Sequence, residues 1–312
     1  MTRVQVASQL PALFNDAFAA STQAAEIVSI APGSAGLAHG PEILIAAPFR
    51  RPGDAFPAQP RGWPFDLRWI QLVSVGIDFY PDWLFEGPVV TTARGASAIA
   101  LAEFALAAIL AEAKHLPDIW ISDRKDWVAK PLATVAGTTL GLIGFGAIGE
   151  ALAPRAQALG MRVIATRRSD LPLAAGVERA DPATIFAQAD HVVLAAPATA
   201  QTERMVDAKL LSLAKPNLHL INIARGILID DDALLAALDE GRVARATLDV
   251  TYPEPLTAGH RYYTHPRVRL SPHTSVHTTE TRRNLSLSFA ANLDRFRRGQ
   301  PLDGVVDRAR GY

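Results

Sequence analysis

The sequence predicts an α/β protein made of two doubly wound domains. Short apolar runs alternate with helical stretches along most of the chain, which is the pattern of parallel strands joined by crossover helices. A glycine-rich turn at 144–149 follows one apolar run directly and opens a helical stretch, as dinucleotide-binding turns do. The length of 312 residues suits two domains, since single domains commonly have roughly 100–200 residues.

In the first third of the chain, apolar runs predict five strands, followed by one long helix from about 97 to 115 that Pro117 ends. The Pro- and Gly-rich stretch at 50–64 is typical of a loop. The strands are expected at Val4–Ser8, Glu26–Ile30, Glu42–Ala47, Trp69–Ser74 and Val89–Ala93.

A second series of strands begins after Thr138. Its clearest helix spans Asp231–Glu240, with acidic residues in the first turn and Gly241 as terminator. A last helix is expected from about Thr279 to Arg298. The strands are expected at Leu140–Gly144, Arg162–Thr166, His191–Ala196, Leu218–Ala224, Ala244–Val250 and Val268–Ser271.

These elements divide into two domains, with a change of pattern near Arg94. We expect a Rossmann dinucleotide-binding domain over 95–278. It is inserted into a smaller, flavodoxin-like substrate-binding domain made of 1–94 and 279–312. A cleft between two such domains would close on a substrate and exclude water.

Composition narrows the function. The chain is 49% hydrophobic and 20% charged, so it can bury substantial cores. Lys plus Arg and Asp plus Glu each total 31, so neither nucleic acid nor an anionic membrane is expected as a partner. The absence of cysteine excludes disulfides, thiolate metal sites and a Cys nucleophile.

Targeting signals are not evident. The start, MTRVQVASQLPALF, does not have the pattern of a secretion signal. Glu103 interrupts the most membrane-like stretch, Ala96 to Ala111, which favours a buried helix over a membrane span. We therefore expect a cytoplasmic enzyme.

The glycine-rich turn predicts where the cofactor phosphates bind. Gly144 permits the tight turn, Gly146 allows the backbone to approach a pyrophosphate, and Gly149 allows close packing of helix on strand. The following helix presents its N-terminal N–H groups to the phosphates. The predicted contacts are Gly144, Phe145, Gly146, Ala147, Ile148 and Gly149.

The residues after the second strand of this domain predict cofactor choice. A site that prefers NAD has a carboxylate there to bind the ribose hydroxyls, whereas this chain has Arg167, Arg168 and Ser169. Two guanidiniums and a hydroxyl suit a 2′-phosphate, so we expect NADP(H) to be preferred over NAD(H). Asp170 is an alternative ligand for the ribose, but it lies several residues beyond the expected end of the strand. A second alternative is that both arginines are merely solvated.

Three later segments, together with the glycine-rich turn, carry a family resemblance: INIARGILIDDDALLAAL at 221–238, ATLDVTYPEPL at 246–256 and VRLSPHTS at 268–275. They resemble the D-isomer-specific 2-hydroxyacid dehydrogenases, and the resemblance runs from SVGID at 74–78 to VVDRARGY at 305–312. Within that family the chain is most similar to the glyoxylate/hydroxypyruvate reductases. The resemblance implies a homodimer and reduction of a small 2-keto acid to the D-2-hydroxy acid.

The same resemblance implies the roles of individual residues. Arg225 binds the substrate carboxylate and polarises the carbonyl, His273 is the catalytic histidine, and Glu254 is its acidic partner. Asp249 matches the residue that hydrogen-bonds the nicotinamide carboxamide. The loop containing Val75 and Gly76 matches the one whose backbone N–H groups hold the substrate carboxylate. We also assign three residues at strand ends to the cofactor site: Pro197, Ile223 and Ala224.

The chemistry of these residue types agrees with those roles. His273 can supply a proton near neutral pH, a nearby Glu254 favours the imidazolium form, and the planar fork of Arg225 can bind a carboxylate bidentately. One departure is that many relatives have a Gly-rich segment after the catalytic histidine, where this chain has Thr274-Ser275-Val276-His277.

Other interpretations remain open at this point. His273 and His277 have the spacing of a metal pair but no evident third ligand, so no metal is expected. Trp127 is either a core aromatic or a residue that reaches a partner subunit. The rival function is a dinucleotide-sensing regulatory or scaffold protein without turnover. Formate dehydrogenase is disfavoured because that relative has Gln in place of Glu254, and phosphoglycerate dehydrogenase with a regulatory domain because the chain stops at Tyr312.

Overall fold

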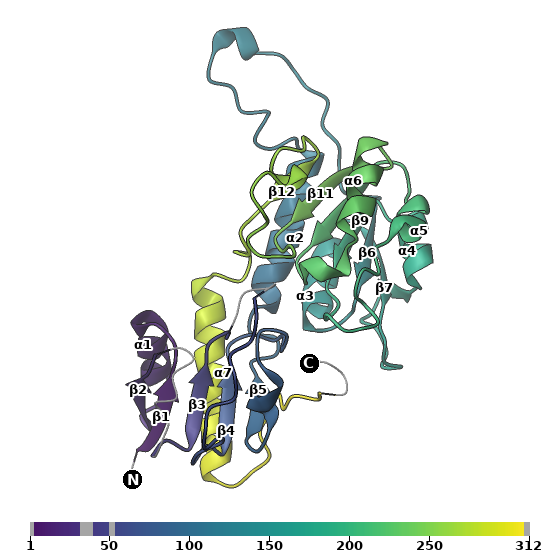
Figure 1. Cartoon of the computed structure of the whole chain (residues 1–312). Coiled ribbons are helices and arrows are strands. Elements are labelled where there is room, and N and C mark those ends of the chain that lie inside the picture. The colour runs from purple at the N-terminus through teal and green to yellow at the C-terminus, as the bar shows by residue number, and fades with distance from the viewer. Residues whose placement is uncertain (1–2, 32–39, 50–53, 309–312) are drawn as a thin grey trace. The chain divides into compact units, whose positions relative to one another are not determined.

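The computed structural model describes residues 3–31, 40–49 and 54–308. Part of the predicted loop at 50–64 and the last residues of the tail therefore lie outside the described residues. The chain divides into two compact units. We call Ala98–Val276 the central unit, and Met1–Ser97 together with His277–Tyr312 the terminal unit. Figure 1 labels the main elements of both.

The central unit contains a parallel sheet in the order β12-β11-β10-β9-β6-β7-β8, as far as its described residues show. The chain winds from β6 to β8 on one side, then returns to β9 beside β6 and continues to β12. This is a doubly wound arrangement with its switch point between β6 and β9, which confirms the predicted α/β class. The strands are β6 (Thr139–Ile143), β7 (Arg162–Thr166), β8 (Val177–Arg179), β9 (His191–Leu194), β10 (Leu218–Asn222), β11 (Val243–Leu248) and β12 (Val268–Leu270).

Helices cover this sheet, and α2 packs against α3 over one apolar core. The sequence analysis did not identify β8, α4 or α5. The two helices are short, but each has an aspartate N-cap: the Asp181 carboxylate accepts from the Thr184 N–H, and the Asp207 carboxylate from the Leu210 N–H. The helices are α2 (Ala98–Ala113), α3 (Ala147–Ala158), α4 (Pro182–Gln188), α5 (Ala208–Ser212) and α6 (Asp231–Asp239), with 3₁₀ turns at Arg124–Asp126, Gly226–Leu228 and Arg261–Tyr263.

The terminal unit has its own parallel sheet, which its described residues place in the order β2-β1-β3-β4-β5. This is the strand order of flavodoxin-like folds. Phe289 packs the last helix, Thr279–Arg297, against the sheet. Its ring stacks on Trp69 with 5.3 Å between the ring centroids, and it meets the ring of Phe18 edge-on with 5.1 Å between centroids. The elements are β1 (Val4–Ser8), α1 (Ala12–Ser21), β2 (Ala25–Ser29), β3 (Ile43–Ala46), β4 (Trp69–Leu72), β5 (Val89–Thr92) and α7 (Thr279–Arg297), with a 3₁₀ turn at Asp82–Phe85.

Several strands end earlier than the apolar runs predict. The predicted strand ends at Ala196, Ala224 and Val250 each lie two residues beyond the observed ends. The extra apolar residues belong to turns that leave the sheet, and three of them, Ile223, Ala224 and Val250, are nevertheless buried. Hydrophobicity alone does not separate a buried turn from a buried strand. These turns lead to the residues assigned to the site.

Two buried histidines lie side by side on neighbouring strands of the central unit. His191 begins β9 and pairs in register with His219 of β10, and their ring centroids are 5.6 Å apart. The His219 Nε2 atom lies 2.9 Å from the Thr247 hydroxyl, whereas neither Nδ1 atom has a hydrogen-bond partner among the described residues. Burial, with His191 and Arg245 nearby, lowers the pKa of His219 to about 3. Burial also lowers the pKa of His191, despite the opposing charges of Asp190 and Glu112.

This pair predicts that acid destabilises the central unit. In the unfolded chain a histidine titrates near its ordinary pKa of about 6.5, so between that pH and the lowered folded value the unfolded chain binds more protons. Stability should therefore fall as pH drops below about 6.5, by about 1.4 kcal/mol per pH unit for each such proton. His219→Asn should reduce this slope, and the exposed His277→Asn should not. Urea unfolding between pH 4 and pH 7 measures the free energy of unfolding at each pH. Equal slopes of that free energy against pH in wild type and His219→Asn would show that His219 does not cause the loss of stability.

Candidate active site

The predicted cofactor and catalytic residues of the central unit gather at one edge of its sheet. All seven strands described there run parallel, so their carboxyl ends share that edge, where open α/β sheets bind ligands. Consecutive strand ends lead to the glycine-rich turn, Arg167, Pro197, Arg225, Asp249 and His273.

The glycine-rich turn has the geometry that a pyrophosphate site requires. Gly144 has φ 101°, and a Cβ there would lie 2.8 Å from Ala195 O, so a side chain is excluded by both conformation and space. A Cβ on Gly146 would have no neighbour within 4 Å, which leaves the backbone approachable from that side. Helix α3 begins directly after Gly146 without a side-chain cap. Its first N–H groups therefore suit phosphate oxygens.

The loop after β7 holds Arg167 partly inward and Arg168 outward. The Arg167 side chain is 14% exposed; its guanidinium donates to Ser169 Oγ at 3.1 Å and to Pro172 O at 3.1 Å, and it lies 3.6 Å from the Glu150 carboxylate. Arg168 and Ser169 are exposed. Arg179 of β8 braces the same loop by donating to the carbonyls of Arg167, Ser169 and Leu171. Two guanidiniums and a hydroxyl thus belong to the loop that follows β7, the place where dinucleotide-binding folds contact the adenosine ribose.

His273 and Glu254 form a close pair. The His273 Nδ1 atom lies 2.9 Å from Glu254 Oε2, and their side chains are 28% and 18% exposed. The other carboxylate oxygen, Glu254 Oε1, accepts from the Thr251 N–H at 3.1 Å, which fixes the carboxylate. With Nδ1 facing Glu254, proton transfer from this ring would use the other nitrogen, Nε2.

Arg225 lies on a braced turn between β10 and the 3₁₀ turn Gly226–Leu228. The buried Asn222 side chain holds this turn, because its amide donates to Arg225 O at 2.8 Å and its oxygen accepts from the Ala224 N–H at 3.0 Å. A Cβ on Gly226 would lie 2.0 Å from the Thr251 carbonyl carbon. Only glycine therefore allows the Arg225 turn to approach the loop that carries Glu254 so closely.

Asp249 is 1% exposed and lies at the end of β11. Both of its carboxylate oxygens accept hydrogen bonds from the segment 271–275. The strand-end residues Ile223 and Ala224 are buried as well, and Pro197 O accepts from the Thr202 hydroxyl at 2.7 Å. The predicted contacts of these residues with a cofactor remain predictions.

The predicted substrate loop belongs to the terminal unit and follows β4. The Ser74 hydroxyl donates to Gly76 O at 2.7 Å and lies 3.2 Å from the Tyr80 hydroxyl, which closes the loop on itself. Phe79 and Tyr80 are buried, and burial raises the pKa of Tyr80 to about 12. These two rings therefore fill the core of the unit. Val75 is 36% exposed.

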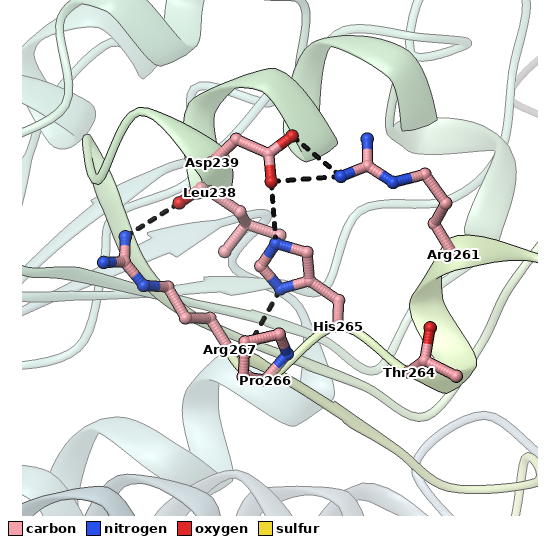
Figure 2. A pocket seen from close by; sticks show the side chains of 7 residues that line it. All are labelled: Leu238, Asp239, Arg261, Thr264, His265, Pro266 and Arg267. Carbon is pink, nitrogen blue, oxygen red and sulfur yellow. Dashed lines mark hydrogen bonds and ion pairs between the residues drawn. The ribbon is translucent and has the colours of Figure 1, made fainter.

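An open hollow of about 410 Å³ lies at the carboxyl end of α6, and it contains none of the predicted site residues. Figure 2 shows how its polar side chains bond to one another. Arg261 donates to both oxygens of Asp239, and Arg267 donates to Leu238 O at 2.7 Å. Cations at a helix carboxyl end stabilise the helix, so this cluster has a structural role. Across the described residues, no three His, Asp or Glu side chains are placed to hold a metal ion.

Sequence reasoning missed the residues that brace the site. Asn222 ends a buried strand whose other residues, apart from His219, are apolar. A buried amide needs hydrogen-bond partners, so this residue was the available signal of a braced turn. Gly226 directly follows Arg225, and Ser271 and Ser275 flank His273. Nothing in the local sequence reveals that Gly226 packs against Thr251, or that the two serines bond to Asp249.

The structure describes no helix that is both long and apolar enough to span a bilayer.

Comparisons with known proteins find relatives by sequence and by structure. The family model for the NAD-binding domain of D-isomer-specific 2-hydroxyacid dehydrogenases matches residues 106–275. The glyoxylate reductase of Thermococcus litoralis is 35% identical over 237 residues, which are 71% of this chain and 71% of that protein. That of Thermococcus gammatolerans is 34% identical over 271 residues, 82% of this chain and 79% of that protein. The crystal structure of a D-isomer-specific 2-hydroxyacid dehydrogenase family protein from Aeromonas salmonicida has a TM-score of 0.81 at 28% identity, covering 98% and 99% of the two chains.

Proposed function

Because the chain belongs to the D-isomer-specific 2-hydroxyacid dehydrogenase family, we propose that it reduces a small 2-keto acid of the glyoxylate or hydroxypyruvate type with NADPH, giving the D-2-hydroxy acid. The observation that carries the proposal is the His273–Glu254 pair, with 2.9 Å between Nδ1 and Oε2. The family is one of nicotinamide-dependent oxidoreductases, and relatives named glyoxylate reductase support the substrate class.

The proposed reaction needs a hydride, a proton and a cation. Bound nicotinamide supplies the hydride to the carbonyl carbon of the substrate. His273 donates the proton from Nε2 to the carbonyl oxygen, and Glu254 stabilises the imidazolium before that transfer. Arg225 binds the substrate carboxylate and draws electron density from the carbonyl. Val75 and Gly76 are proposed to hold the same carboxylate through backbone N–H groups.

The proposed preference for NADPH rests on the loop after β7. Arg167, Arg168 and Ser169 offer charge-assisted donors to a 2′-phosphate, and they occupy the position where a carboxylate would bind the ribose of NAD. The bonds from Arg179 to the loop carbonyls support the idea that this loop is held in one conformation for recognition.

Steady-state assays of the purified protein test the proposal. Glyoxylate, hydroxypyruvate and pyruvate should each be offered with NADPH and with NADH. We expect the highest kcat/KM for one of the first two substrates with NADPH, and hydroxypyruvate should yield D-glycerate. A protein that binds NADPH but oxidises none with any of these acids would support a sensing or scaffold role instead.

Glu254→Gln should lower kcat for reduction. The carboxylate meets His273 Nδ1 at 2.9 Å, and the amide removes the negative charge that faces the ring while keeping the size of the side chain. We expect a loss smaller than the roughly 10²–10⁴-fold contribution of the general acid itself. The exposed Glu203→Gln is the matched control. Wild-type kcat in Glu254→Gln would show that Glu254 is not the partner of His273.

We also propose a homodimer in which the segment joining α2 to β6 contacts the second copy. Figure 1 shows this segment extending away from the helices of its own unit. Its apolar side chains are exposed, with Trp120 at 73%, Trp127 at 81% and Val128 at 70%, and clustered exposed apolar residues mark interaction surfaces. Light scattering would decide between the mass of one chain, 33.4 kDa, and that of two.

A further inference from the structure

The loop after β4 is closed by a hydrogen bond from its own side chain. The Ser74 hydroxyl donates to Gly76 O at 2.7 Å. A bond from the side chain of one residue to the backbone two residues further on closes a small ring. That ring contains the peptide groups 74–75 and 75–76, which carry the N–H groups of Val75 and Gly76. The bond therefore fixes the directions in which both N–H groups point.

These two N–H groups are available to a ligand. Within residues 3–31, 40–49 and 54–308, neither the Val75 N–H nor the Gly76 N–H donates a hydrogen bond. Val75 is 36% exposed, so this part of the loop is open to solvent. Successive backbone N–H groups in a turn suit an anion such as a carboxylate.

Tyr80 holds the Ser74 side chain from the buried side of the loop. Its hydroxyl lies 3.2 Å from Ser74 Oγ and 3.4 Å from Ala46 O. The Tyr80 N–H donates to Ile77 O at 3.1 Å, and its ring, in a residue only 3% exposed, meets Phe49 edge-on with 6.1 Å between the ring centroids. Burial raises the pKa of Tyr80 to about 12, so the hydroxyl is uncharged near neutral pH. It is thus a fixed polar contact for Ser74.

We infer that Tyr80 and Ser74 are positioning residues for the substrate carboxylate. The Tyr80 hydroxyl holds the Ser74 side chain against Gly76 O, and the bond so formed presents the two loop N–H groups to the carboxylate. This inference rests on the proposed function, in which the loop binds that carboxylate. Without the bond the peptide groups would sample several orientations, and ordering them on binding would weaken the affinity for substrate.

Removing either hydroxyl should raise KM for the 2-keto acid more than it changes kcat, because the substrate and the transition state share the contact that is weakened. We expect KM to rise by about 2- to 10-fold in Tyr80→Phe, the effect of one neutral hydrogen bond. In Ser74→Ala the rise should be about 10- to 100-fold, because the bonds to a charged carboxylate are weakened. The Kd of NADPH, measured by fluorescence, should stay within about twofold of wild type in both variants.

Oxamate separates binding from turnover, because it has a carboxylate like that of a 2-keto acid but is not reduced. Calorimetric titration of oxamate into the NADPH complex should show a Kd that rises by the same factor as KM in each variant. Ser74→Thr retains the hydroxyl and should recover most of the affinity that Ser74→Ala loses. Because Tyr80 acts through Ser74, adding Tyr80→Phe to Ser74→Ala should raise KM no further.

Ser286→Ala is the matched control. Ser286 belongs to α7 of the same unit, is 4% exposed and donates to Arg283 O at 2.8 Å, so this variant removes a buried hydroxyl that does not bond to the loop. It should leave both KM and the Kd of oxamate unchanged.

Three results would each overturn the inference. The first is an unchanged KM and an unchanged Kd of oxamate in both Tyr80→Phe and Ser74→Ala. The second is equal KM in Ser74→Ala and Ser74→Thr, and the third is a further rise in KM when Tyr80→Phe is added to Ser74→Ala. A wild-type protein that oxidises no NADPH with any 2-keto acid would instead overturn the proposed function, and the oxamate titrations would still decide the roles of Ser74 and Tyr80.

Discussion

Replacing His273 with alanine is expected to lower kcat for 2-keto acid reduction by about 10²–10⁴-fold, the usual contribution of a general acid. The ring lies 2.9 Å from the Glu254 carboxylate, and this pair is the proposed source of the proton. The glycine-rich turn that would bind the phosphates follows a different strand, β6. NADPH should therefore bind to the variant nearly as tightly as to wild type, as fluorescence titration would show.

His277→Ala is the matched control for this substitution. His277 lies four residues further on and is exposed, so its loss should leave kcat unchanged. If the purified His273→Ala variant reduced substrate at the wild-type rate, the proton would have to come from another group. If it lost NADPH binding as well, the loss of activity would not identify His273 as the proton donor.

Much of the fold could be predicted because its signals are local. Buried parallel strands are continuous apolar runs, so β6, β7, β9 and β10 were found within a few residues of their observed ends. The glycine-rich turn was recognisable because Gly144 must adopt a positive φ against Ala195. Strand β8 was missed because its three residues, Val177–Arg179, are not buried and have no apolar run.

The catalytic residues could be named from motifs, but the bonds between them could not. His273 and Glu254 are nineteen residues apart, and nothing in the intervening sequence requires the imidazole of His273 to meet the carboxylate of Glu254. Asp249 illustrates the limit most clearly. Its motif predicts contact with a cofactor, but its partners within the protein, Ser271 and Ser275, could not be predicted because they are set by how the ends of β11 and β12 pack together.

Replacing Arg167 with aspartate is expected to weaken NADPH by roughly ten- to hundredfold. A hydrogen bond to a charged group is worth about 1.5–3 kcal/mol, which corresponds to that factor. The new carboxylate would also repel the 2′-phosphate and would offer the ribose of NADH an acceptor, so KM for NADH should be unchanged or lower. Arg168 and Ser169 can cushion the loss by sharing the phosphate.

The position of the Arg167 side chain makes a second variant informative. Its guanidinium bonds to Ser169 and lies 3.6 Å from Glu150, so Arg167→Ala removes the cation without adding an anion beside that carboxylate. Steady-state kinetics with both cofactors should therefore show a smaller NADPH defect in Arg167→Ala than in Arg167→Asp. Arg61→Asp, at an exposed position of the terminal unit, controls for charge alone and should match wild type. If wild type used NADH as efficiently as NADPH, both arginines would be surface charge and the proposed specificity would be wrong.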